Sequence, residues 1–286
     1  MPEENQRPSF THLFQIHLLF ERNGTRPSAA ALQEAARPTL GETDVVAEVK
    51  NQLTTLAVKR FQAYYKDAQR VPAQVLMADF APFDSASIDQ MQRSQFWECP
   101  QGGELLDRCG IQVMLSDFMA AGLPYKERSA LLTGWLEAVL PLFPDCLAVW
   151  VPSAWKLLTP AQVLDNGLEG PGRFLHFGVN ARFFRIQGTE DMLVDTLGLH
   201  ALGLPDVQYH FHGLDPNHVV NHAYNVASYI FDNDTPIRGG ETIDGLRDGR
   251  IDQTVQWKCQ YETAMVAPQR DVMDICPGPY AAGDRS

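Results

Sequence analysis

The chain has 286 residues, of which 45% are hydrophobic and 20% are charged, as in a folded globular protein with a substantial core. Its net charge of −12 is shared by both halves, which argues against nucleic-acid binding, because that function needs a basic surface. The N-terminal segment lacks a signal-peptide-like apolar core, and no stretch approaches about 18 consecutive apolar residues. We therefore expect a cytoplasmic protein that does not contact membranes.

The first half of the chain alternates predicted strands and helices. Apolar and β-branched runs predict strands over 13–20, 53–65, 71–80 and 111–118, the last as a central strand. Helical segments are expected after Ser28, after Asp84 and over 102–109, where Ser28 and Asp84 are typical N-caps. The order β-α-β-β-α-β is that of the ferredoxin-like arrangement.

A long amphipathic helix, from Lys126 to about Leu140, ends at Pro141 and leads into a second series of elements. In this series Thr159 and Pro160 form a typical helix start. The other elements expected are strands over 146–153, 174–186, 206–213 and 254–266 and a helix over 218–231.

Both series contain a strand, a turn with an aspartate (Asp84, Asp215) and a helix. The sequence thus predicts an α+β protein of two ferredoxin-like halves with mostly antiparallel sheets and packed helices. The alternative is that such junctions recur by chance. The predicted division is an N-terminal half over 1–125, a connecting helix over 126–145, a C-terminal half over 146–276 and a loose tail over 277–286.

Several segments have amino-acid sequences that are similar to those of a known family. They are DTLGLHALGLPDVQ (195–208) and ASYIF (227–231), with weaker support from FWECPQGGELLDRC (96–109), SDFMAAGLPYKER (116–128) and APQRDV (267–272). The chain resembles the uncharacterised bacterial domain-of-unknown-function family 4261, with 195–233 as the defining segment. The resemblance implies soluble bacterial proteins with no assigned reaction, cofactor or catalytic residue. An association of some members with toxin systems favours a binding role.

Histidines are concentrated near this segment and suggest a metal site. His210 and His212 share one face of a strand, and His218 and His222 share one face of a helix. Because Val207, Tyr209 and Phe211 should face the core and the helix, we expect the strand pair to point away from the helix pair. Four ligands then do not converge, which leaves His218 and His222 as the metal candidates, and no cofactor is expected.

Four residues are candidates for catalysis: Asp195, His210, Asp215 and His218. Asp215 followed by Pro216 is also explained as a helix N-cap, and Asp195 as part of a glycine-containing bend. The chain has no G-x-G-x-x-G, P-loop, H-E-x-x-H or G-x-S-x-G motif.

Five single cysteines without a C-x-x-C pair fit reduced thiols. Cys99 paired with a histidine is a formal nucleophile, but a lone cysteine is more often structural.

The leading functional hypothesis is a protein-binding module with a basic partner, of the kind that neutralises an effector as an immunity protein or antitoxin. One alternative is a hydrolytic or metal-dependent enzyme that uses the segment 195–222. Another is small-molecule binding between the two halves. The sequence leaves the oligomeric state open.

Overall fold

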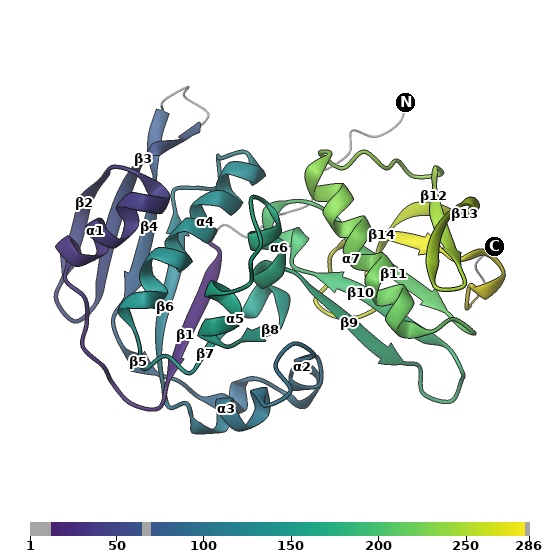
Figure 1. The fold of residues 1–286 in the computed structure, drawn as a ribbon, viewed down its shortest axis with the longest axis horizontal. Coiled ribbons are helices and arrows are strands. Elements are labelled where there is room, and N and C mark those ends of the chain that lie inside the picture. The colour runs from purple at the N-terminus through teal and green to yellow at the C-terminus, as the bar shows by residue number, and fades with distance from the viewer. Residues whose placement is uncertain (1–12, 65–69, 284–286) are drawn as a thin grey trace. The chain divides into compact units, whose positions relative to one another are not determined.

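The structure is a computed structural model that describes residues 13–64 and 70–283. The described residues form two compact units, one up to Gly178 and the other from Val179 onward. Each unit is built on one β-sheet with its own helices (Figure 1).

The sheet of the first unit has β6 and β1 at its centre, and its neighbouring strands are antiparallel. Short β5 (Ala81–Pro82) adds to β6. In sheet order the other strands are β2 (Thr43–Val49), β3 (Leu53–Tyr64), β4 (Arg70–Ala78), β6 (Ile111–Phe118), β1 (Gln15–Phe20), β7 (Ala148–Val151) and β8 (Lys156–Leu158).

Helices α1 (Ala29–Leu40) and α4 (Tyr125–Val139) pack against one another along this sheet (Figure 1). Their contact is close at Gly134, whose carbonyl accepts a hydrogen bond from Oγ1 of Thr39 at 2.8 Å. The remaining helices are shorter: α2 (Gln90–Arg93), α3 (Gly102–Arg108), α5 (Pro160–Leu164) and α6 (Gly172–Gly178).

The second unit consists of two three-stranded segments joined by helix α7 (Pro216–Asp232). The pair β11–β14 is parallel and the other neighbouring pairs are antiparallel. In sheet order the strands are β12 (Thr242–Arg247), β13 (Arg250–Thr263), β14 (Asp271–Cys276), β11 (Asp206–Phe211), β10 (Met192–Leu197) and β9 (Asn180–Arg185).

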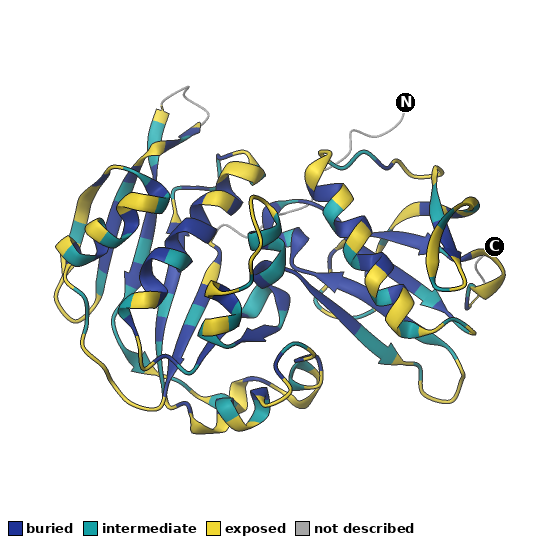
Figure 2. Cartoon of the chain, in the orientation of Figure 1, coloured by how far each residue is buried: buried dark blue, intermediate teal, exposed yellow. Residues whose placement is uncertain are grey.

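Helix α7 packs on β9, β10 and β11, and its apolar stripe is buried while its outer side is exposed (Figure 2). This pattern follows from apolar residues spaced three and four apart, which place one continuous stripe on a helix. Tyr209 and Phe211 belong to the set of β11 residues that faces the helix, and both are fully buried.

The α+β class and the mostly antiparallel sheets predicted from the sequence are confirmed. The ferredoxin-like arrangement is not confirmed. The predicted β-α-β-β-α-β order contains four strands, whereas the two sheets of the described residues have eight and six strands. The two units also differ from each other in strand order, so their topology lends no support to duplicated halves.

The division of the chain differs from the predicted one. The boundary lies after Gly178, because β7 and β8 pair within the first sheet and the helix expected to connect the halves packs there as α4. The strand expected over 174–186 is split into α6 and β9. The tail, which was expected to be loose, packs on β11 up to Gly283. The backbone N–H of His212 donates to the carbonyl of Tyr280 at 2.9 Å, and the backbone N–H of Ala282 donates to the carbonyl of His210 at 3.0 Å. Its last three residues lie outside the described residues.

Replacing Gly134 with alanine should lower the free energy of unfolding by about 1–3 kcal/mol, as expected for overpacking. A Cβ at this position would lie 2.6 Å from Cδ2 of the fully buried Leu40 and 3.3 Å from Cβ of Thr39. The matched control is Gly103→Ala, because a Cβ there meets nothing within 4 Å and helical alanine is favoured over glycine. Urea unfolding of both variants measures the difference, and equal stability of the two would contradict the packing analysis.

Candidate functional site

A row of polar side chains crosses the sheet of the second unit on the face opposite α7. Arg182, Asp195, Gln208 and Asp274 stand in direct register on β9, β10, β11 and β14. All four are completely buried. A buried polar side chain is costly unless it is hydrogen-bonded, so the partners of these groups decide what they can do.

Asp195, the first catalytic candidate, lies between two arginines. Arg182 donates to both of its carboxylate oxygens, from Nε at 2.8 Å and from Nη2 at 2.5 Å. Nη2 of Arg270 donates to the second oxygen at 2.7 Å. Paired guanidinium hydrogen bonds of this kind are among the strongest in proteins. The carboxylate is therefore enclosed by its partners and shielded from solvent, which is unfavourable for a general base.

Arg270 extends this network to a second aspartate. Its Nε donates to Oδ2 of Asp206 at 3.0 Å, and its Nη2 donates to the carbonyl of Thr196 at 2.8 Å. Its Nη1 donates to the carbonyls of Val266 and Pro268. The guanidinium therefore ties the loop between β13 and β14 to the sheet. Arg182 adds to this attachment through the carbonyl of Ala267 at 2.8 Å.

Asp206 organises the turn that follows β10. Its carboxylate accepts hydrogen bonds from the backbone N–H of Leu199 at 3.1 Å, from Oγ1 of Thr196 at 3.2 Å and from Nδ1 of His200 at 2.9 Å. Burial raises the pKa of this carboxyl, but the His200 hydrogen bond and the charge of Arg270 outweigh burial and hold the pKa below its usual value. The segment DTLGLHALGLPD (195–206) thus contains the end of β10, the turn that follows it and the carboxylate around which the turn is arranged.

His222, a predicted metal ligand, is buried with both ring nitrogens in use. Nε2 lies 2.8 Å from the carbonyl of Asp244 and therefore donates to it. Nδ1 then accepts a hydrogen bond from the Tyr209 hydroxyl at 2.7 Å. Burial lowers the pKa of His222, in agreement with a neutral imidazole. This arrangement fixes α7 to β11 and β12, and it leaves no lone pair for a metal.

The candidates Asp215 and His218 lie at the start of α7. Asp215 is the N-cap, as predicted, and its side chain accepts from the N–H of Asn217 at 2.9 Å. His218 is exposed, and its imidazole lies against Gly249, where an added Cβ would come within 2.3 Å of the ring. The two residues are therefore accessible, unlike Asp195.

His210 lies on the sheet face opposite Tyr209 and hence opposite His222. Its Nε2 is 3.8 Å from Oδ2 of Asp191, and Nδ1 of His212 is 3.9 Å from the other oxygen of that carboxylate. The expected separation of the two histidine pairs agrees with this geometry. Within residues 13–64 and 70–283, no three His, Cys, Asp or Glu side chains are grouped to hold a metal ion.

Cys99, the formal nucleophile, is completely buried, and burial raises the pKa of its thiol. A raised pKa reduces the thiolate fraction and with it the reactivity.

No helix in the described part of the chain is long and apolar enough to cross a membrane.

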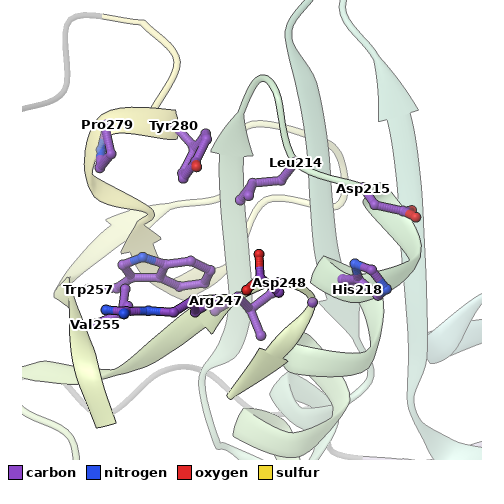
Figure 3. A pocket seen from close by; sticks show the side chains of 11 residues that line it. Leu214, Asp215, His218, Arg247, Asp248, Val255, Trp257, Pro279 and Tyr280 are labelled. Carbon is purple, nitrogen blue, oxygen red and sulfur yellow. The ribbon is translucent and has the colours of Figure 1, made fainter. Parts of the chain in front are cut away.

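A pocket of about 280 Å³ opens beside the two accessible candidates (Figure 3). Asp215 and His218 line one side from α7, and Trp257 of β13 lies on another side, with Asp248 between them in this view. Tyr280, from the segment after β14, closes the top. Pattern reading of the sequence found Asp215 and His218 but not the hairpin and tail residues, which carry no motif and join the site only through folding.

The buried network was also only partly visible in the sequence. The sequence indicates Asp195 as a candidate, but its partners Arg182 and Arg270 are separated from it by 13 and 75 positions. The available signal was an isolated charge within an apolar strand, as in NARFFRI, together with the arginine of APQRDV. A charged residue in such a setting calls for a buried partner.

Asp195→Asn should lower the free energy of unfolding by about 3–5 kcal/mol, because the buried Arg182 and Arg270 would lose the carboxylate that they share, and only Arg270 would still face Asp206. The matched control is Asp191→Asn, in the turn before the same strand, which should change stability by no more than about 0.5 kcal/mol. Denaturant unfolding measures both. A D195N protein as stable as the control would show that the network contributes little.

The ring of His222 should titrate below pH 6.5 in the folded protein and near 6.5 in urea, because burial lowers its pKa. The unfolded chain then binds the proton more readily, so stability is lost as the pH falls through about 6.5. Burial also lowers the pKa of His17 and His176, so all three rings contribute to this loss. An NMR titration of the ring protons isolates His222, and a folded-state pKa at or above 6.5 would refute the assignment.

No curated protein and no solved structure matches the chain. Residues 195–276, which contain Asp195, Asp206, His222 and Arg270, match the family described as Domain of unknown function (DUF4261). Over this segment the chain is therefore similar to the DUF4261 family, in agreement with the resemblance carried by its sequence.

Proposed function

We propose that this protein is a protein-binding module whose partner is basic. The observation that carries the proposal is where the charge lies. Among residues 13–64 and 70–283, buried acidic and basic side chains balance, four against four: Asp117, Asp195, Asp206 and Asp274 against Arg128, Lys156, Arg182 and Arg270. The net negative charge of the residues that the structure describes therefore lies on side chains that are not buried.

Such a charge distribution favours association with a basic surface. Summed surface charge steers an oppositely charged partner and raises the association rate. It also keeps the free protein soluble and opposes self-association, since copies of the chain repel each other. A basic effector that is neutralised by an immunity-type protein is one partner with this chemistry.

The environment of the catalytic candidates gives less support to a hydrolytic function. Asp195 is enclosed and doubly paired, and His222 uses both nitrogens. Asp215 and His218 are accessible, but Asp215 caps α7. A general base must reach the proton that it removes, so the enclosed groups are poorly placed for that role.

The test is capture of a partner from cells that express the protein, followed by measurement with both purified proteins. We expect a basic partner whose affinity weakens at least tenfold between about 0.1 and 1 M salt, as the Debye length shrinks from about 10 to about 3 Å. Calorimetric titration at the two salt concentrations gives this ratio.

Thermal unfolding of each protein alone at both salt concentrations is the control, because it separates weaker association from loss of structure. Failure to capture any specific partner would contradict the proposal. So would a partner whose affinity does not respond to salt.

A further inference from the structure

We propose that the pocket beside α7 receives one arginine side chain of the partner. This inference rests on the proposed function and names the site through which it acts. The pocket lies entirely within the second unit and has walls from α7, the β12–β13 hairpin and the segment after β14 (Figure 3).

The size of the pocket fits one side chain. Its volume of about 280 Å³ lies at or below the lower end of the roughly 300–1,000 Å³ typical of small-molecule sites. An inserted side chain of a partner is the usual anchor of a protein interface, and arginine is among the residues that contribute most.

The walls combine apolar and aromatic surface. Leu246 and Val255 provide aliphatic surface, and Trp257 and Tyr280 provide rings. The indole of Trp257 is held in place, since it packs against His222 with ring centroids 5.0 Å apart and leaves no room for a Cβ at Gly245. Trp257 is almost completely buried, whereas Tyr280 is 39% exposed. A guanidinium can therefore stack on the ring of Tyr280 while its aliphatic stem lies on the apolar wall.

The charges that surround the pocket favour a cation. Asp215 and Asp248 are exposed carboxylates of the lining. Arg247 is the cation of the lining, and its charge is met by Asp252, with Nε and Oδ2 3.0 Å apart. His218 completes the ionisable groups of the lining. Negative charge is thus in excess among the charged residues of the lining.

Asp248 is the best residue for a test because its replacement should leave the hairpin intact. Asp248 and Gly249 form the two-residue turn between β12 and β13, with φ of 51° and 76°. Positive φ at both positions is typical of a type I′ turn, for which Asn-Gly is at least as suitable as Asp-Gly. Asp248→Asn therefore removes the charge and retains the turn.

The experiment uses the full chain labelled with ¹⁵N, and Nα-acetyl-argininamide as the probe. Nα-acetyl-citrullinamide is the matched neutral compound. We expect the arginine probe to shift the amide signals of Leu214, His218, Asp248 and Gly249, with a dissociation constant in the millimolar range. The citrulline probe should produce shifts at least about fivefold smaller at equal concentration.

Asp248→Asn should weaken binding of the arginine probe about fivefold, the effect of one exposed ion pair near 1 kcal/mol. Asp271→Asn, an exposed aspartate outside the pocket lining, is the charge-matched control and should leave binding unchanged. The amide spectrum of each variant also reports whether it is folded.

Equal shifts with both probes, shifts outside the pocket, or no binding up to the solubility of the probe would each overturn the proposal. The outcome is independent of the capture experiment, because no partner is needed. If a partner is captured and Asp248→Asn binds it as well as Asp271→Asn does, the binding function stands and the pocket assignment fails.

Discussion

The second unit depends on the pairing of Asp195 with Arg182 and Arg270. Removing three charged groups from water is expensive, and the cost is offset only where every hydrogen-bonding position finds a partner. Here the guanidinium groups also satisfy carbonyls of the loop between β13 and β14, at Val266, Ala267 and Pro268. The arrangement therefore favours the observed register of β9 and β10, because a shift of one residue would move Asp195 to the other face of the sheet.

The structure also explains the roles of several residues in the segment that matches the family, 195–276. Asp206 gathers the backbone N–H groups of the turn after β10, and Gly198 in that turn has a φ of 139°, which favours glycine. Tyr209 lies on the opposite face of the sheet, where its hydroxyl group donates a hydrogen bond to His222 of α7 and so positions the helix. These residues of the family segment therefore stabilise the fold, and the accessible surface beside α7 is available for binding.

Local features of the fold could be predicted from the sequence because they depend on neighbouring residues. Ser28, Thr159 and Asp215 are N-caps as expected, with their side chains accepting backbone N–H bonds. Strand β6 begins and ends where its apolar run does. Such signals need no knowledge of the rest of the chain.

The strand order and the partners of buried groups could not be predicted in this way. Edge strand β2 has an exposed surface with only weak alternation, and β14 follows a loop whose course is set by Arg182 and Arg270. The density of histidines suggested a shared site, but alternation along β11 sends His210 and the histidines of α7 to opposite faces of the sheet. Long-range pairing, not residue type, decides the role of each ring.

A double-mutant cycle on Asp195→Asn and Arg270→Gln tests most directly whether these groups act as one unit. The two side chains are 2.7 Å apart and almost completely buried, so the account predicts a coupling free energy of at least about 1.5 kcal/mol in urea unfolding. Additive effects, with a coupling below about 0.5 kcal/mol, would contradict the claim that this pairing holds the second unit together.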